Sequence, residues 1–344
     1  MMYGKQYSLL PVVAVVLTVC GARGQDQKML HEESFFTKSL HYTNKGIQYV
    51  YSKEQGGLER LTGLSAEQAG CVKSECHVTS CDECHRKDTL GKASYSLEPA
   101  LAQEACGRCH DSIAKDDPDV HYRKGMKCMD CHSSREIHGD GIAHNSYMEG
   151  GVLETRCEKC HGSIARTVSH TVHKGKLDCT VCHALESKTC LNCHIESRLK
   201  GAKGGRVQLK NMFLLVNHGG RVKLANMLSY VYQKKTMITF APTFAHSIKK
   251  EGRKCGECHD SPIVRDIRND KFRAVRWENG AMKNVEGVIP VLEGMDWKLV
   301  YLDRIDTTWV PLEDPPAPLV NYSGSSRPIT KEQFEKLSLP QGSH

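Results

Sequence analysis

The chain has 344 residues, 17 cysteines and a formal charge of +7 at neutral pH. This length suggests one to three domains. Only 6% of the residues are aromatic and the mean hydropathy is −0.46. This apolar content is low for a hydrophobic core built from side chains alone. After residue 24 no uninterrupted apolar run reaches about eighteen residues, so the later sequence excludes a membrane-spanning helix.

Residues 1–24 have the pattern of a secretory signal peptide. Lys5 lies in a short N-terminal segment, the apolar run Leu9–Val19 follows it, and small residues precede position 25. We therefore expect export to the periplasm or the cell surface. Cys20 leaves a lipid anchor open as the alternative, although a valine precedes it where lipoproteins usually have a small residue.

Sixteen of the 17 cysteines belong to one repeated pattern, Cys-x-x-Cys-His. One copy is expanded, with four residues between its cysteines. The cysteine pairs are Cys71 and Cys76, Cys81 and Cys84, Cys106 and Cys109, Cys128 and Cys131, Cys157 and Cys160, Cys179 and Cys182, Cys190 and Cys193, and Cys255 and Cys258. The histidines that follow them are His77, His85, His110, His132, His161, His183, His194 and His259. This pattern is the attachment site of a c-type haem, in which both thiols bond to one porphyrin and the histidine binds its iron.

Two other chemistries use paired cysteines. Zinc sites need two such pairs, but they do not require a histidine directly after the second thiol. A thioredoxin-like redox pair occurs once, on a βαβ unit, rather than eight times. The sequence therefore predicts eight covalently attached haems, and we expect the apoprotein to be largely unfolded because metal binding and folding are coupled.

The remaining histidines are numerous enough to supply a second ligand to every iron. Apart from the terminal His344 they are His31, His41, His121, His138, His144, His170, His173, His218 and His246. An iron held by two histidines has no vacant position and passes electrons without bond chemistry. We expect eight bis-histidine haems that relay electrons, with no catalytic residue. Spacing alone does not assign each second histidine to its iron.

Along the chain, we expect an N-terminal segment at 25–70 and a seven-haem region at 71–200. Residues 201–259 form a connector with the eighth haem, and 260–344 form a haem-free tail. Within the second region, Cys106–Lys115 matches Cys157–Arg166 at an offset of 51 residues. We interpret 106–138 and 157–194 as a duplicated two-haem module.

The expected fold is mostly irregular and α-helical, organised by haem, with little regular secondary structure. Leu58–Leu64 favours a helix, and short helices are expected to begin near Ser112 and Ser163. Some β-structure is left open after residue 205, where Ser229–Tyr232 and Thr236–Phe240 favour strands. We call each copy of the Cys-x-x-Cys-His pattern a box. Glycines that precede several boxes, among them Gly125, Gly175 and Gly252, are expected to allow tight turns.

The positive charge does not indicate nucleic-acid binding. Eight haems would add about sixteen propionate charges and about eight positive charges on oxidised iron, which brings the protein near neutrality. Many lysines are then expected to pair with propionates. The expected partners are redox proteins, which we expect to bind through small and transient interfaces. Peripheral membrane association and a homo-oligomer stay open.

Through its boxes and flanking histidines, over about 71–194 and 246–259, the sequence resembles the multihaem c cytochromes of anaerobic, metal- and sulfur-metabolising bacteria. The resemblance implies electron transfer outside the cytoplasmic membrane. Related octahaem enzymes imply an alternative, reduction of small nitrogen or sulfur compounds at one open or lysine-ligated haem. Extracellular cytochrome filaments imply another, in which His31 or His41 would bind iron of the next subunit.

Overall fold

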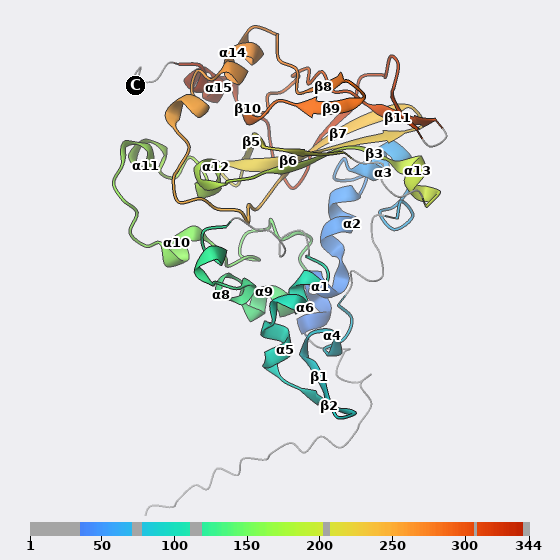
Figure 1. The fold of residues 1–344 in the computed structure, drawn as a ribbon, viewed down its shortest axis with the longest axis vertical. Helices are drawn as coiled ribbons and strands as arrows, with labels where there is room; N and C mark the ends of the chain where they lie inside the picture. Colours follow the sequence, from blue (N-terminus) through green and yellow to red (C-terminus); the bar gives the residue numbers. More distant parts are fainter. Residues whose placement is uncertain (1–34, 71–77, 111–118, 202–206, 306–307, 340–344) are drawn as a thin grey trace, which may run out of the picture.

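The computed structural model describes residues 35–70, 78–110, 119–201, 207–305 and 308–339. Two regions stand out in Figure 1. Short helices fill the lower part of the view, and a twisted sheet with the C-terminal segment fills the upper part. The predicted signal peptide, Cys20, His31 and the box from Cys71 to His77 lie outside the described residues.

The first described helices run from the lower region up to the sheet (Figure 1). They are η1 (Phe35–Lys38), α1 (Leu40–Thr43), α2 (Lys45–Tyr51) and α3 (Leu58–Thr62). The Ser39 side chain caps α1 by accepting the backbone N–H of Tyr42. The helix expected from residue 58 is confirmed as α3, and its Leu58 and Leu61 pack with Ile195 in a small core cluster.

The lower region consists of short helices joined by turns. They are α4 (Asp82–His85), α5 (Leu97–Leu101), α6 (Gln103–Gly107), η3 (Tyr122–Lys124), α8 (Cys128–Cys131), α9 (Ser134–His138) and α10 (Cys157–Cys160). The next two helices, α11 (Val168–His173) and α12 (Cys179–His183), lie at the level of the sheet (Figure 1), and Val181 of α12 packs against it. One exposed hairpin, β1 (Arg86–Thr89) with β2 (Lys92–Tyr95), projects from the lower region. Gly125 and Gly175 have left-handed backbones, with φ of 89° and 74°, which confirms the expected tight turns there. Gly252 does not have a positive φ.

The upper region is built on a mixed seven-stranded sheet. Its strands are β3 (Lys188–His194), β4 (Val207–Lys210), β5 (Met212–His218), β6 (Arg221–Tyr232), β7 (Lys235–Pro242), β10 (Gly287–Pro290) and β13 (Leu319–Tyr322). The long strand β6 pairs with β5 and then β3 along one edge, and with β7 along the other. The segment after residue 260 adds β10 next to β5 and β13 next to β7, both parallel. That segment therefore completes the sheet.

Helices and two further hairpins cover the sheet. They are α13 (Ile195–Leu199), η4 (Cys255–Glu257), α14 (Pro262–Arg268), α15 (Lys331–Ser338), β8 (Val275–Glu278) with β9 (Ala281–Asn284), and β11 (Leu302–Ile305) with β12 (Thr308–Pro311). The main core lies here: the Phe240 ring packs 4.9 Å from the Trp297 ring, and both are buried.

The expected fold class was wrong. Helices make up 30% of the structure and strands 27%, with a seven-stranded mixed sheet. The sequence favoured β6 and β7 in part, but β5, β7 and β10 are buried on both faces and so lack the polar–apolar alternation that marks a strand. The helix expected at Ser163 was also wrong, since α11 begins at Val168 after the Thr167 cap. Ser112 lies outside the described residues.

Candidate functional site: paired histidines beside the cysteine boxes

Six of the seven described boxes share one backbone conformation. In five of the six, the first cysteine begins or directly precedes a single helical turn, whereas Cys106 lies in the last turn of α6 (Gln103–Gly107). In five of the six boxes the histidine N–H donates to the carbonyl of the first cysteine, over 2.7–3.0 Å: His85 to Cys81, His110 to Cys106, His132 to Cys128, His161 to Cys157 and His259 to Cys255. The sixth box is the helix α12 itself, Cys179–His183. Residues three apart on a helix share one face, so the turn brings both thiols to the same side.

Each of these six box histidines faces a second histidine from elsewhere in the chain. The ring centres lie 5.9–6.4 Å apart in all six pairs. The pairs are His41 and His110, His85 and His138, His121 and His161, His132 and His246, His170 and His183, and His173 and His259. The structure therefore brings together six box histidines and six of the nine candidate second ligands.

The spacing of these pairs is narrow and fits a shared metal. Two imidazoles bonded to one metal through nitrogens at about 2 Å place their ring centres about 6 Å apart. Aromatic pairs in general spread over about 4.5–7 Å. Six pairs within half an ångström of one another favour a common cause, which is room for one metal atom between the rings.

Hydrogen bonds fix the orientation of eight of these twelve rings, and each uses Nδ1. Five of the bonds go to backbone carbonyls at 2.8–3.2 Å: His85 to Ser96, His170 to Ala165, His173 to Ser169, His183 to Lys249 and His259 to Lys336. The others join His41 to the Tyr147 hydroxyl, His121 to Asp119 and His132 to Glu136. A hydrogen bond at Nδ1 selects the tautomer and makes Nε2 the nitrogen that coordinates a metal.

Glu136 is a supporting residue that the sequence analysis missed. Its buried carboxylate lies 2.8 Å from Nδ1 of His132 and accepts the Thr155 N–H at 2.7 Å. Burial alone would raise its pKa, but the hydrogen bonds from His132 and from backbone N–H groups outweigh it, so the pKa is lowered. The sequence did hold a signal, because Ser133 and Glu136 form the Ser-x-x-Glu capping box of α9.

Burial also keeps one ligand candidate uncharged. It lowers the pKa of His41 to about 4, and the neighbouring His110 adds to the effect. The imidazole is then neutral at physiological pH, which is the form that binds a metal. His41 lies against His110 of its own chain.

Taken in chain order, and passing over the Cys190 box, the six boxes form a series in which each lies near the next. At every step a thiol of one box raises the pKa of a thiol in its neighbour: Cys109 acts on Cys84, Cys128 on Cys106, Cys160 on Cys131, Cys179 on Cys157, and Cys255 on Cys182. Burial and the neighbouring Cys128 raise the pKa of Cys106 to about 11. Whatever the six boxes hold is thus arranged as a line.

The box Cys190–His194 is built differently. It lies in strand β3, with a register shift between Cys190 and Cys193 and a left-handed Asn192 at φ 60°. His194 is buried, and its Nε2 lies 3.0 Å from Oδ1 of Asp303. Its ring meets Trp309 edge-on at 5.5 Å rather than a second histidine.

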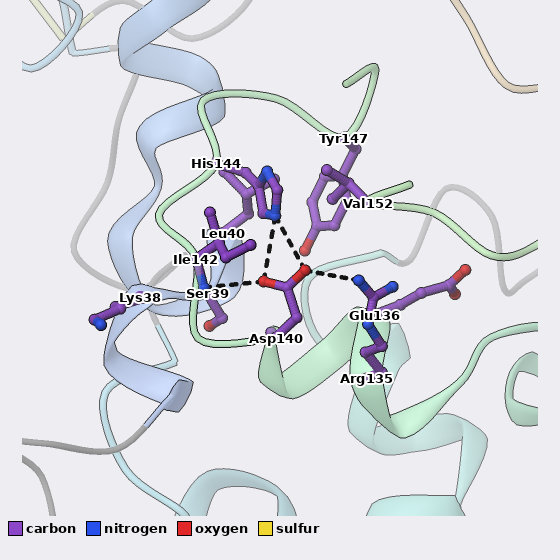
Figure 2. Close-up of a pocket in the computed structure, with 11 residues that line it drawn as sticks. Lys38, Ser39, Leu40, Arg135, Glu136, Asp140, Ile142, His144, Tyr147 and Val152 are labelled. Atoms are coloured by element: carbon purple, nitrogen blue, oxygen red, sulfur yellow. Dashed lines mark hydrogen bonds and ion pairs between the residues drawn. The ribbon is translucent and has the colours of Figure 1, made fainter. Parts of the chain in front are cut away.

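Two candidate ligands in the described residues lie away from any box histidine. Both ring nitrogens of His144 contact carboxylates. Nδ1 lies 3.0 Å from Glu149, and Nε2 lies 3.2 Å from Asp140, as Figure 2 shows. The cavity beside them is about 10 Å³, room for one water at most. His218 ends β5, and its buried Nδ1 has no hydrogen-bond partner. His31, His77, Cys71 and Cys76 lie outside the described residues.

Among the described residues, no group of three or more His, Cys, Asp or Glu side chains is arranged to hold a bare metal ion. In the same part of the chain, no helix combines the length and apolar character needed to cross a membrane.

Comparison with known proteins gives one distant similarity. No protein-family model matches the chain, and no solved structure does. The chain is 24% identical over 182 residues to the dissimilatory sulfite reductase MccA of Wolinella succinogenes, which covers 44% of this chain and 24% of that protein. The match thus spans about a quarter of the relative's length. The chain is similar to part of a sulfite-reducing enzyme.

Proposed function

We propose that this protein is a multihaem c-type cytochrome that relays electrons through bis-histidine haems. The observation that carries the proposal is the set of six histidine pairs, each spaced for one metal and each containing the histidine of a Cys-x-x-Cys-His box. The two thiols of each box would hold the porphyrin covalently, and the paired rings would bind its iron from both sides. The bound haem would supply a reversible one-electron change at iron.

The chain's own residues would fix the ligands and close the iron to other molecules. Backbone carbonyls such as Lys249 O and Lys336 O hold the rings through Nδ1. Carboxylates do the same for His121 and His132, and a carboxylate hydrogen bond makes a ring nitrogen more basic and lowers the potential of its iron. With two histidines of the protein holding each iron, such a site would pass electrons and bind no substrate.

The order of the boxes supports a relay. Each of the six turn-forming boxes adjoins the next along the chain, so electrons would enter near one end of the line, at Cys81–His85 or Cys255–His259, and leave near the other. We further propose eight haems in all, counting the boxes at Cys71–His77 and Cys190–His194, and function outside the cytoplasmic membrane with redox proteins as partners.

The first test is to count covalent haem in the purified protein and record its low-temperature EPR spectrum in the oxidised state. We expect at least six low-spin ferric centres per chain. Fewer than six covalent haems would contradict the proposal. His170→Ala, which removes a ring paired with His183, should convert one centre to high spin. The matched control His144→Gln removes a ring held only by carboxylates and should leave the spectrum unchanged.

A second candidate function is reduction of a small sulfur compound. It is favoured by the similarity to a dissimilatory sulfite reductase and by the lack of a second histidine beside His194 among the described residues. The test is to mix the chemically reduced protein with sulfite and follow reoxidation of its haem bands. Reoxidation matched by sulfite consumption would support the enzyme; reduced bands that persist would contradict it.

A further inference from the structure

Arg253 lies between the last two of the six turn-forming boxes. Its backbone N–H donates to the Cys182 carbonyl at 3.0 Å, and the next box begins two residues later at Cys255. Burial raises the pKa of Cys182, and it raises the pKa of Cys258 to about 12; at both thiols the charge of Arg253 opposes the rise. The guanidinium is therefore within electrostatic reach of one thiol in each of the two boxes.

This guanidinium is buried with little negative charge around it. Only 7% of the side chain is exposed. Nε donates to the Val181 carbonyl at 3.1 Å and Nη2 donates to the Ala184 carbonyl at 2.7 Å, while the Phe213 ring centre lies 3.5 Å from the guanidinium carbon. The Glu257 carboxylate is 3.8 Å from Nη1, beyond hydrogen-bond distance. Because arginine keeps its charge in proteins, a buried and incompletely compensated positive charge remains here.

Gly252, the preceding residue, shows that this segment passes beside the metal-binding edge of His183. A Cβ at Gly252 would lie 3.6 Å from Cε1 and 3.7 Å from Nε2 of His183. Nδ1 of the same ring already bonds to the Lys249 carbonyl at 3.2 Å, so Nε2 is the nitrogen left for iron. Gly252 does not have a positive φ, so its backbone angle does not require glycine. The close approach to His183 accounts for a residue without a side chain.

The two boxes that come earlier in the line have the opposite charge beside their ligands. Nδ1 of His132 lies 2.8 Å from the Glu136 carboxylate. Nδ1 of His121 lies 3.2 Å from the Asp119 carboxylate, and the His121 ring faces His161. Both carboxylates are buried. Negative charge on a ligand favours oxidised iron, whereas positive charge nearby favours reduced iron, so the sign of the local charge changes along the line.

We propose that Arg253 makes the haems at Cys179–His183 and Cys255–His259 the most easily reduced of the six, so that electrons leave the relay at the Cys255 end. This inference rests on the proposed function, because it presumes haem at the boxes. Reduction adds one electron to a haem, and the buried guanidinium stabilises that added negative charge because little water screens it. Each transfer oxidises one iron and reduces the next. A reduced redox protein supplies electrons at Cys81–His85, and an oxidised one removes them at Cys255–His259.

Arg108 offers a matched comparison within the same line of boxes. Its charge also acts on thiols of two neighbouring boxes, Cys84 and Cys106, where it opposes the rise in pKa caused by burial. Unlike Arg253, it is exposed. Water and salt screen an exposed charge, so Arg108 should change the potentials of its neighbours much less.

The test is a potentiometric titration of the full-length, haem-loaded protein, followed by absorbance and EPR. Arg253→Met removes the charge and keeps an unbranched side chain beside Phe213. At a fixed potential it should lower the ratio of reduced to oxidised haem about tenfold at two centres, as expected for the loss of one partly screened charge. These two should be the centres that reduce first in the wild type. One of them should be the low-spin signal that His170→Ala removes, because His170 faces His183.

Two further variants separate the charge from the packing. Arg253→Lys keeps the charge and should titrate close to wild type, and Arg108→Met should shift no centre by more than about threefold. Arg253→Gln keeps an N–H donor for the two carbonyls without the charge, so it replaces Arg253→Met if that variant does not fold.

Three results would overturn the inference and leave the relay standing. They are unchanged potentials in Arg253→Met and Arg253→Gln, equal shifts in the Lys and Met variants, or a shift confined to the centres that reduce last. Equal shifts would mean that Arg253 acts only through its hydrogen bonds to Val181 and Ala184. Fewer than six covalent haems per chain would instead contradict the proposed function itself.

Discussion

The region of the six boxes and the sheet differ in how much buried apolar surface stabilises them. Among the described residues between Val78 and Leu177, Val152 is the one buried hydrophobic side chain, and Leu90, Leu97 and Val168 are largely exposed. Strands β5, β6 and β7 carry buried apolar side chains along most of their length. Burial of apolar surface is the main source of folding free energy. The box region therefore depends on apolar surface that its own side chains do not provide, whereas the sheet supplies its own.

The largest effect should come from withholding haem. When the protein is produced without haem attachment, we expect the box region to lose nearly all amide protection, because it lacks a side-chain core. Strands β5–β7 should keep theirs. Hydrogen exchange measured by mass spectrometry on haem-loaded and haem-free protein compares the two regions directly. Equal loss of protection in both would show that the sheet also depends on haem and would remove the distinction.

A core substitution tests whether the sheet is stabilised by its own buried side chains. Phe240 is fully buried between Trp297 and Tyr322, so Phe240→Ala should lower the free energy of unfolding of the sheet by about 3–5 kcal/mol. Tryptophan fluorescence during denaturant unfolding reports it. The exposed Val320→Ala, on the neighbouring strand β13, is the control and should change stability little. A changed spectrum of the haems proposed at the six paired boxes in Phe240→Ala would mean that the two regions are coupled.

The sequence shows where the boxes are, but it does not show which distant histidine faces each box histidine. Cys-x-x-Cys-His is a local motif, so it is visible wherever it occurs. The contact of His132 with His246, in contrast, depends on how the chain passes from the box region to the sheet and back, which no local pattern encodes.

One pairing rule could have been found from the repeat. His121 lies between the two boxes of the first module and faces His161, the first box histidine of the second module. His173 holds the matching position in the second module and faces His259. The Cys255 box shares Cys-Gly-x-Cys-His-Asp-Ser with the Cys106 box, so it acts as the first box of a third, incomplete unit. Each module thus supplies the histidine that faces the first box histidine of the next.

The fold was harder to predict for a physical reason. The sheet joins β10 and β13 to strands far earlier in the chain, and such non-local pairing leaves no local signal. Cys190–His194 has the same motif as the six turn-forming boxes, but pairing with β6 holds it extended. There the tertiary context overrides the local pattern.

Asn192 tests what keeps this strand box different. Asn192→Ala removes both hydrogen bonds that the side chain makes with the Leu302 backbone and leaves a residue with a Cβ at positive φ, which should reduce stability by about 2–4 kcal/mol. Asn192→Gly loses the same bonds but tolerates the backbone angle, so it should be milder by about 1 kcal/mol. Faster amide exchange in residues 302–305, with the six paired boxes unaffected, is the expected local result. Unchanged exchange there would mean that the two hydrogen bonds between Asn192 and Leu302 do not hold the β11–β12 hairpin in place.

The smallest effect is expected on substituting His144. This substitution distinguishes a structural histidine from a metal ligand. Burial lowers its pKa, but hydrogen bonds and charge interactions with Glu149 and Asp140 outweigh burial, so the pKa lies above its ordinary value of 6.5. A raised folded-state pKa contributes stability that is fully present below about pH 6.5 and is lost as the pH rises through the folded value. His144→Gln should therefore lower stability by about 1 kcal/mol at pH 6 and by much less at pH 9. Thermal unfolding at the two pH values measures this difference. A variant that loses equal stability at both, or that gains a high-spin haem signal, would show that His144 acts as something other than a charged partner of these two carboxylates.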